Sequence, residues 1–449
     1  MSQTYKIRKG HNIKLIGDAP QKHLGSVASS IYAVSPSDFP GITPKLVVKA
    51  GTQVNAGDVL FYDKDRPEVL ICSPVSGEVT EIKRGAKRKI LQVIVLADSD
   101  TKYADHGSFD LKSTDREATA SHFANTGVGA LITSRPYGVA ASMHELPRDI
   151  FVNGVQSGPL AGDLAYQLAG KEIEVAAAIE ALSLMTAGKV YVSQDGDAPM
   201  MELLSHEKAT SILFTGKHPK GLVGTQIAQA APMNKGEIVW TVNAVDLPII
   251  GHAFLTGKYA PSYQVVLAGS KAKNTGYASM TQGVSLSSFV SANIDNDNTR
   301  IIAGDVLTGT AIEENGFLGF GKSQITAIPE GNSTEFFGWV LPGFGKFSTN
   351  RAFWSWLFPN RKYDLDTNIH GEERAFVVTG EYDKFIPMDI FPQQLLRCIL
   401  IGDVEKMEQL GIYEVLPEDF ALAEVACTSK LPLQQIVRDG LMDLRKEMM

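Results

Sequence analysis

The sequence is poor in cysteine. Its 449 residues include three cysteines, Cys72, Cys398 and Cys427, which lie far apart and form no CxxC pair. A structural zinc site or an iron–sulfur cluster uses about four soft ligands, and these usually come in close pairs. The spacing therefore argues against a metal centre in this chain, and we expect buried, reduced thiols instead.

Long hydrophobic runs are also missing. The longest apolar stretches, residues 174–188 and 247–255, are interrupted by Glu180 and by Pro248 with His252. Neither approaches the roughly 20 apolar residues of a membrane-spanning helix. The first residues contain no apolar segment of signal-peptide length. We therefore expect no transmembrane segment, so a role at a membrane would depend on a protein that spans it.

Positive charge is in deficit. The sequence has 42 Lys and Arg against 50 Asp and Glu, which gives a formal net charge of −8. Because proteins that bind nucleic acids favour a basic surface, no nucleic-acid partner is expected. The same balance argues against docking on anionic lipid head groups by charge alone.

Most nucleotide-binding and catalytic motifs are absent or lack their structural context. The sequence contains no HExxH and no GxSxG motif, and its GxG pairs at Gly127, Gly319 and Gly343 lack the third glycine of a dinucleotide-binding fingerprint. Residues 316–323 match the phosphate-loop pattern GxxxxGKS, but residues 324–329 predict a strand where that motif requires a helix. A glycine-rich β-turn is the better interpretation.

Two polar loops imitate known sites. Lys64 lies near where a carrier domain displays its lipoylated or biotinylated lysine, but its loop is long and charged. A solvated surface lysine is the expected state. Residues 295–298 resemble the beginning of a calcium loop, whose twelfth position would be Val306 and not the required glutamate. A polar turn is therefore predicted there.

The sequence changes character along the chain, and its length suggests about three domains. Residues 1–100 contain two copies of a rhythm of short strands and glycine turns, at 42–61 and 73–96. Gly51 and Gly57 fit turns that need a positive φ. We predict an N-terminal strand followed by a barrel-sandwich of the type found in lipoyl and biotin carriers.

Residues 101–257 alternate between helical and strand-like segments. A capped helix is expected to begin at Asp115 and a second helix to cover 160–184, with strands at 189–193, 211–215 and 237–242. Strands that are separated by helices indicate βαβ units and a largely parallel sheet. This part is therefore predicted to be a Rossmann-like α/β domain.

The last two parts are predicted to be a small β module and a helical tail. Residues 258–342 contain strand-like stretches at 263–269 and 276–280, typical of a β-grasp (SLBB-like) domain with flanking strands. Residues 343–449 are predicted to be largely helical, and Pro432 fits the first position of a helix over 433–448. A helix over 393–410 would place these apolar side chains near one face: Leu396, Ile399, Leu400, Met407 and Leu410.

One loop is the candidate binding site. Residues 126–138 open the α/β part, where such folds place a ligand crevice. Arg135 could hold an anion and Tyr137 could stack on a flat ring, with Pro136 between them. In the alternative interpretation, Arg135 satisfies backbone carbonyls or pairs with an acid. No residue is predicted to be catalytic, to bind a cofactor or to bind a metal.

The order of these parts, together with a series of short blocks, resembles the NqrA family, the A subunits of the bacterial sodium-translocating NADH:quinone oxidoreductases, over essentially the whole chain. Most specific are the blocks between Arg374 and Leu422. The blocks are 73–77, 84–88, 135–137, 221–225, 239–243, 300–307, 374–376, 381–382, 387–390, 395–397, 402–403 and 417–422.

The resemblance implies a peripheral protein on the cytoplasmic face of the inner membrane, held chiefly by the B subunit in the membrane. The whole complex would pass electrons from NADH to ubiquinone and export sodium. The resemblance also implies that FAD, FMN, riboflavin and an iron–sulfur centre belong to other subunits, and that this chain has no redox cofactor and is not catalytic alone. It leaves open whether quinone binds in this chain, near Arg135, Pro136 and Tyr137, or in the membrane partner.

The alternative is a flavin- or NADH-binding dehydrogenase subunit. The family is similar in layout to the NADH-binding subunit of respiratory complex I, where a glycine-rich loop holds FMN and a cysteine-bearing tail holds a cluster. Here residues 127–138 lack the run of glycines, and the tail contains only Cys398 and Cys427. A third possibility is a lipoyl or biotin carrier modified at Lys64.

Overall fold

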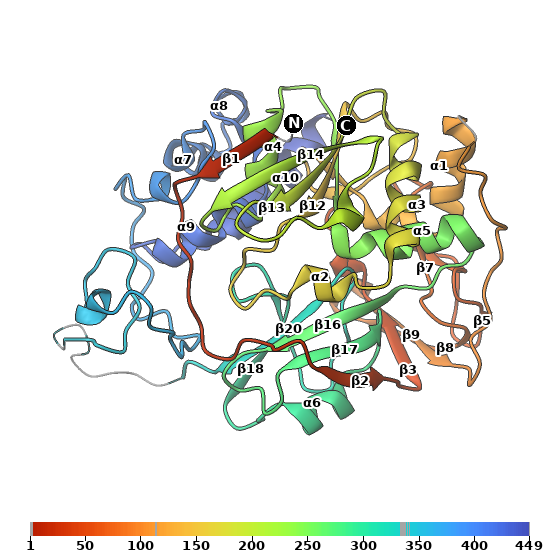
Figure 1. The fold of residues 1–449 in the computed structure, drawn as a ribbon, viewed down its shortest axis with the longest axis horizontal. Helices are drawn as coiled ribbons and strands as arrows, with labels where there is room; N and C mark the ends of the chain where they lie inside the picture. The colour runs from red at the N-terminus through yellow and green to blue at the C-terminus, as the bar shows by residue number, and fades with distance from the viewer. Residues whose placement is uncertain (1–2, 113–114, 333–337, 339, 341, 449) are drawn as a thin grey trace.

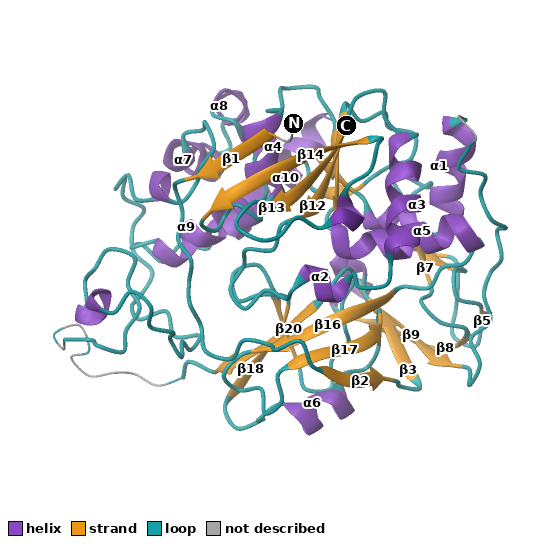
Figure 2. Cartoon of the chain, viewed as in Figure 1, coloured by secondary structure: helices purple, strands orange, loops and turns teal. Residues whose placement is uncertain are grey.

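The computed structural model describes residues 3–112, 115–332, 338, 340 and 342–448. Its strands form four sheets, of seven, six, four and three strands. The α/β sheet lies at the top of Figure 1, the six-stranded sheet at the bottom and the N-terminal sandwich on the right. Figure 2 shows that the helices gather around the α/β sheet and in the C-terminal region.

The N-terminal sandwich is confirmed. A four-stranded sheet, in the order β3-β9-β8-β5, and a three-stranded sheet, in the order β4-β6-β7, bury Leu60, Phe61, Val79, Val93 and Val95 in the protein interior. Its elements are β3 (Ile31–Val34), η1 (Pro36–Asp38), β4 (Pro44–Leu46), β5 (Gln53–Val54), β6 (Val59–Asp63), β7 (Leu70–Cys72), β8 (Gly77–Arg84), η2 (Ala86–Arg88) and β9 (Ile90–Ala97).

The predicted parallel sheet is confirmed as well. Strands β14, β13, β12 and β15 lie side by side in that order and run parallel. The helix predicted over 160–184 is instead two helices, because Gly170 adopts a φ of 75° between them. The elements are β12 (Asp149–Gly154), α2 (Leu164–Gln167), α3 (Glu172–Ser183), β13 (Val190–Asp195), η4 (Glu202–Leu204), β14 (Ala209–Gly216), α4 (Val223–Ala230), β15 (Val239–Asn243), η5 (Ala244–Asp246) and α5 (Leu247–Thr256).

Both edges of this sheet come from neighbouring parts of the chain. Strand β1 (Gln3–Ile7) pairs in parallel with β14, which ties the N-terminus to the α/β sheet. On the other edge, β10 (Thr133–Arg135) pairs antiparallel with β15, and β11 (Val139–Ala140) pairs antiparallel with β10. These two strands follow α1 (Arg116–Asn125) and η3 (Val128–Leu131). Asp115 caps α1 as predicted, because its side chain accepts hydrogen bonds from the N–H groups of Glu117 and Ala118.

The six-stranded sheet contains the predicted β-grasp strands. Strand β2 (His23–Val27), from the N-terminal part, pairs with β17 at its edge. The GxxxxGKS stretch lies between two strands of this sheet and is followed by strand β20, so the predicted β-turn interpretation is confirmed. The elements are β16 (Ser262–Ala268), β17 (Gly276–Thr281), α6 (Ser287–Asn293), β18 (Thr299–Ala303), β19 (Thr310–Ile312) and β20 (Gln324–Pro329).

The C-terminal region becomes helical from Pro392 onward. The described residues before it form loops with two short 3-10 helices, η6 (Trp354–Leu357) and η7 (Tyr382–Lys384). The single helix predicted over 393–410 is wrong, because Gly402 ends the first helix with a φ of 72°. Leu400, expected on the apolar face, is exposed. The elements are α7 (Pro392–Ile401), α8 (Val404–Gln409), η8 (Ile412–Glu414), η9 (Pro417–Phe420), α9 (Ala421–Ala426) and α10 (Leu433–Met448).

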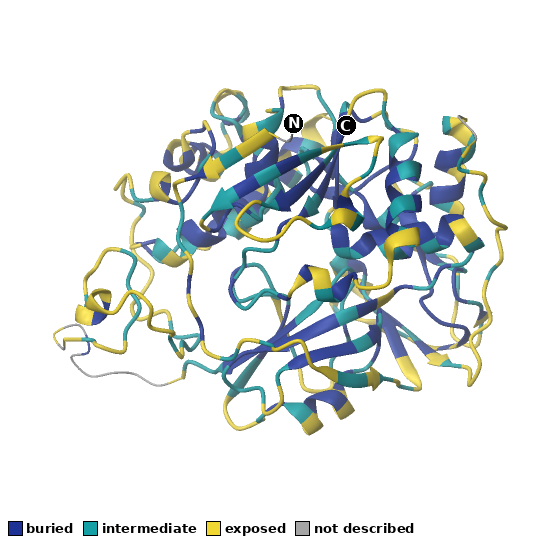
Figure 3. Cartoon of the chain, viewed as in Figure 1, coloured by how far each residue is buried: buried dark blue, intermediate teal, exposed yellow. Residues whose placement is uncertain are grey.

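The largest hydrophobic core joins the sandwich, the α/β domain and the six-stranded sheet (Figure 3). A second core lies among the C-terminal helices and includes Ile13 and Leu15 of the N-terminal segment. All three cysteines are buried, as expected, and burial raises the pKa of the Cys72 thiol to about 12. In the described part of the chain, no helix is long and apolar enough to cross a membrane.

Candidate functional site

The order of the parallel strands defines where a ligand crevice would lie. The chain progresses from β12 to β13 and β14 on one side and then returns to β15 on the other side of β12. In open α/β sheets, ligands bind at such a switch point, beyond the carboxyl ends of the strands. The crevice would therefore begin after Gly154, which ends β12, and after Asn243, which ends β15.

On the β12 side, the chain itself fills this position. The backbone of Gly221 lies so close to the end of β12 that a Cβ atom on it would be 2.6 Å from Ser157 Oγ. The Asn153 side chain donates to the carbonyl of Gly221 at 2.9 Å, and the N–H of Gly221 donates to Ser157 Oγ at 2.8 Å. Ser157 Oγ also lies 3.0 Å from His218 Nδ1. These contacts hold residues 218–221 against the end of β12.

A buried lysine ties the same segment to the neighbouring strand. Lys220 donates to Asp195 Oδ1 at 2.6 Å and to Asp197 Oδ2 at 2.8 Å. Burial alone would lower the pKa of Lys220, but its hydrogen bonds with the two carboxylates outweigh this and raise it. The same contact lowers the pKa of Asp197. The Lys220 ammonium donates to both of these carboxylates and is therefore part of an internal hydrogen-bond network.

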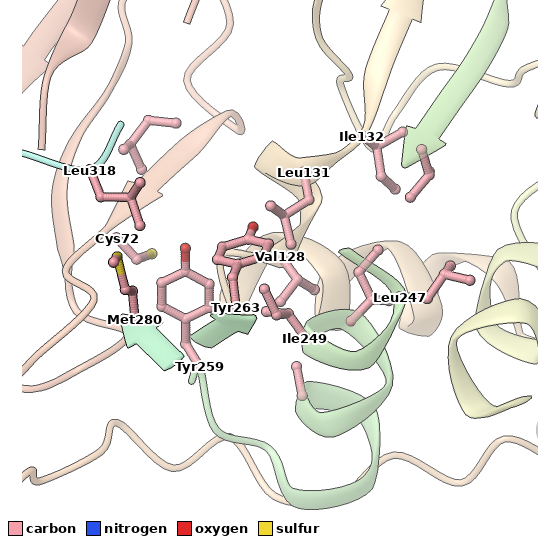
Figure 4. Close-up of a cluster of buried hydrophobic side chains, with 14 of the residues drawn as sticks. Cys72, Val128, Leu131, Ile132, Leu247, Ile249, Tyr259, Tyr263, Met280 and Leu318 are labelled. Atoms are coloured by element: carbon pink, nitrogen blue, oxygen red, sulfur yellow. The ribbon is translucent and has the colours of Figure 1, made fainter. Parts of the chain in front are cut away.

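On the β15 side, the residues that follow the strand are buried in the core. Asp246, which follows β15, is 2% exposed, and its carboxylate accepts a hydrogen bond from the Tyr263 hydroxyl at 2.8 Å. Burial raises the pKa of Asp246 to about 7, against the opposing effect of hydrogen bonds from Tyr263 and Asn243. Figure 4 shows Tyr263 and Tyr259 within a cluster of apolar side chains that includes Val128 and Ile249.

One groove in the described part of the structure lies elsewhere. It has a volume of about 470 Å³ and is formed by the helical tail. Its walls come from α7, α8, α10 and the Gly402 turn, and none of its lining residues belongs to the α/β sheet. This groove is therefore separate from the expected crevice of the α/β sheet.

The predicted site residues Arg135, Pro136 and Tyr137 lie at the opposite edge of the sheet. Arg135 pairs with Val239, the first residue of β15, because β10 runs antiparallel to that strand. The turn after Arg135 is consequently at the end where the parallel strands begin. The expectation that this loop borders the ligand crevice is wrong for Arg135–Tyr137, and the reason is the antiparallel direction of β10.

Arg135 is a buried tie to the helical tail. It is 1% exposed, and its guanidinium donates to the carbonyl of Glu414 at 3.2 Å. The same guanidinium lies 3.4 Å from Glu418 Oε1 and 3.6 Å from Asp419 Oδ2. Burial raises the pKa of Asp419, and the charge of Arg135 opposes that rise. These contacts agree with the alternative interpretation of Arg135, in which it satisfies backbone carbonyls or pairs with an acid.

Pro136 and Tyr137 are less enclosed than Arg135. Both are half-buried, and Tyr137 packs against the core of the helical tail. The carbonyl of Tyr137 accepts a hydrogen bond from Arg438 of α10 at 3.3 Å. Burial raises the pKa of the Tyr137 phenol. The structure therefore brings the three predicted residues together under the tail, with Pro136 and Tyr137 partly open to solvent.

The residues of the tail that contact Arg135 and Tyr137 could not be identified from the sequence. Glu414, Glu418, Asp419 and Arg438 lie about 280 to 300 positions from the loop they contact. Residues 417–422 form one of the blocks that resemble the family, but nothing in their spacing indicates a contact with Arg135. A buried arginine needs an acidic partner, but the local sequence pattern does not show that Arg135 is buried or where its partner lies.

The other two loops that resemble known sites, around Lys64 and Asp295, lie at the protein surface. Lys64 is exposed, and its backbone N–H donates to the carbonyl of Thr43 at 2.8 Å. The pKa of Asp295 is lowered, chiefly by a hydrogen bond from the Asp297 N–H and then by one from Lys271 at 3.3 Å. Among the described residues, no group of three or more His, Cys, Asp or Glu side chains could hold a metal ion.

The fold and this site define a class of protein: a Rossmann-like domain between a carrier-type sandwich and a β-grasp sheet. Residues near the usual ligand crevice are bonded to one another. Three family models match successive parts of the chain. These are the NqrA N-terminal barrel-sandwich hybrid domain at residues 5–98, the NqrA second alpha/beta domain at 114–259 and the NQRA C-terminal domain at 264–314.

Relatives match over nearly the full length. The A subunit of the Na(+)-translocating NADH-quinone reductase of Rhodopirellula baltica is 33% identical over 98% of both chains. Proteins of the same name from Vibrio atlanticus and Hahella chejuensis are 31% and 32% identical over 98% of this chain and 99% of theirs. The chain belongs to the NqrA family, the A subunits of the Na(+)-translocating NADH-quinone reductases. A solved chain of an NAD+-reducing [NiFe]-hydrogenase aligns with 51% of this chain and with 52% of its own length, at 13% identity. Its TM-score of 0.35 is too low to support a conclusion about this chain.

Proposed function

We propose that this chain is a peripheral component of a sodium-translocating NADH:quinone reductase and carries no redox cofactor of its own. The observation that carries the proposal is the match to NqrA proteins over 98% of the chain. The filling of the switch-point crevice by Gly221, Ser157 and the Asp246–Tyr263 pair supports it, because a flavin or a dinucleotide would need that space.

In this proposal the chain lies on the cytoplasmic face of the inner membrane and is held chiefly by the B subunit in the membrane. Flavins and an iron–sulfur centre belong to other subunits, which pass electrons from NADH to quinone and export sodium. This chain helps to shape the quinone end of the complex. The proposal includes four units, at residues 1–100, 101–257, 258–342 and 343–449, with β1 and β2 of the first unit paired to sheets of the next two.

The role is tested by deleting the chain from cells that contain the complex and assaying their membranes. We expect NADH:quinone reductase activity to be lost, while NADH oxidation by a soluble one-electron acceptor persists, because the cofactors remain in other subunits. Returning the chain should restore the quinone activity. If a complex that still assembles loses both activities together, the chain takes part in NADH oxidation and the proposal is wrong.

Quinone contact at Arg135, Pro136 and Tyr137 remains a prediction, and it has its own test. Tyr137 is the informative position, because it is half-buried while Arg135 is enclosed. If a quinone ring stacks on Tyr137, Tyr137→Leu should weaken binding of a soluble quinone by roughly three- to tenfold, measured by calorimetry. The matched control is Tyr103→Leu, an exposed tyrosine in another part of the chain. An unchanged Kd in Tyr137→Leu removes these residues from the quinone site.

A further inference from the structure

An aromatic lobe stands out on the surface of the chain. We define it as the described residues of 338–363, a loop segment that extends from the body at the left of Figure 1 and is largely exposed in Figure 3. Trp354 is 58% exposed and Trp356 is 50% exposed. The other large exposed apolar side chains of the lobe are Val340, Phe344, Leu357 and Phe358.

Hydrogen bonds within the lobe hold the tryptophans in place. The N–H of Trp354 donates to the carbonyl of Pro342 at 2.9 Å, and Ser355 Oγ donates to the carbonyl of Lys346 at 2.5 Å. Arg361 donates to the carbonyl of Phe344 at 2.8 Å. Because the backbone is tied in this way, the short helix η6 presents Trp354 and Trp356 outward, although neither is needed for a hydrophobic core.

The lobe also reverses the charge of the chain. Between Glu335 and Asp364 the sequence contains no acidic residue, although the whole chain has a net charge of −8. Two of the basic side chains lie over aromatic rings: the Arg351 guanidinium is 5.6 Å from the Trp356 ring centre, and the Lys346 ammonium is 5.4 Å from that of Phe353. Lys362 forms an ion pair with Asp18 of the N-terminal segment. The basic residues are Lys346, Arg351, Arg361 and Lys362.

We infer that the aromatic lobe binds the surface of an anionic phospholipid bilayer, with Trp354, Trp356 and Phe358 at the depth of the head groups. Tryptophan and phenylalanine beside lysine and arginine are typical of segments that lie in this interface. Net negative charge argues against lipid docking by the chain as a whole, and the lobe provides a local exception. The inference rests on the proposed position at the cytoplasmic face.

Lipid fits the lobe better than a membrane protein does. Cytoplasmic loops of membrane proteins carry an excess of lysine and arginine, so they would repel Arg351 and its basic neighbours. The cytoplasmic leaflet carries anionic lipids and a negative surface potential, which attracts them. The acid-free lobe is therefore complementary to the leaflet, whereas the acidic remainder of the chain is complementary to basic loops.

The test uses the purified full-length chain and two kinds of vesicle, phosphatidylglycerol mixed with phosphatidylethanolamine and phosphatidylcholine alone. We expect the chain to float with the anionic vesicles and its tryptophan emission to shift to the blue. Trp354→Ser with Trp356→Ser should weaken this binding at least about tenfold. Arg351→Gln, which keeps both tryptophans, should weaken it about fivefold, since one basic residue contributes about 1 kcal/mol at such a surface. Binding should be weaker to phosphatidylcholine.

The control replaces two exposed apolar residues outside the lobe, Leu146→Ser with Ile173→Ser, and should bind vesicles like the unaltered chain. Equal vesicle binding by the control and the tryptophan variant would overturn the inference. So would a chain that binds neither vesicle but whose tryptophan variant fails to assemble with the membrane subunits, because the lobe would then contact protein. Neither result affects the proposed function, which depends on the quinone reductase assay.

Discussion

Arg135→Ala is expected to lower the free energy of unfolding by about 3–5 kcal/mol, the usual cost of removing one partner from a buried ion pair. Arg135 is enclosed, and it is the cation that offsets the buried carboxylate of Asp419. Its loss also leaves the carbonyl of Glu414 without this donor. Because these partners lie in the helical tail, hydrogen exchange should show the largest loss of protection in residues 414–448.

Arg300→Ala is the matched control. Arg300 donates to both carboxylate oxygens of Glu330, at 2.6 and 2.8 Å, but its side chain is 39% exposed. Ion pairs in contact with solvent contribute about 1 kcal/mol or less. If chemical denaturation gives the two variants equal stability, Arg135 does not hold the tail and the interpretation of its contacts is wrong.

Asp246→Asn is expected to change how stability depends on pH. Burial raises the pKa of Asp246 to about 7 from an ordinary value of 3.8, so the folded chain keeps a proton that the unfolded chain has lost. The stability from this group is fully present below about pH 4 and is lost as pH rises to about 7. The shift corresponds to roughly 4 kcal/mol across that window. Asparagine is neutral at every pH and still offers Tyr263 an acceptor.

The free energy of unfolding of the Asp246→Asn variant should therefore increase relative to that of the unaltered chain as pH rises from 4 to 8. Chemical denaturation at several pH values measures this difference. Asp443→Asn serves as the control, because the Asp443 side chain is 69% exposed and the substitution should leave a constant difference. A constant difference for Asp246→Asn would show that the Asp246 carboxyl is not buried as described.

Local pattern was sufficient where an element's own residues determine its structure. Strands β13, β14 and β15 fall at the predicted apolar runs, and α10 covers the predicted residues 433–448. The helix predicted over 393–410 failed because Gly402 takes a left-handed conformation that periodicity does not reveal. Strands β1 and β2 could not be assigned to their sheets, because their partners β14 and β17 lie far along the chain.

The candidate site was harder to predict than the fold. The sequence identified the loop around Arg135 as unusual, but the edge of the sheet on which it lies depends on the antiparallel direction of β10. The occupied crevice was not foreseen either. It follows from two contacts. The approach of Gly221 to Ser157 joins residues 64 positions apart, and the Asp246–Tyr263 hydrogen bond joins the α/β domain to β16 of the six-stranded sheet.

The central proposal is that this member of the NqrA family has no redox cofactor, because its own residues pack against the ends of β12 and β15 where a cofactor would bind. The most direct measurement is the visible absorption spectrum of the full-length chain, purified under native conditions and followed by denaturation to release any bound flavin. We predict no flavin absorption before or after denaturation. Flavin released in an amount equal to the chain would contradict the claim and return the α/β domain to redox catalysis.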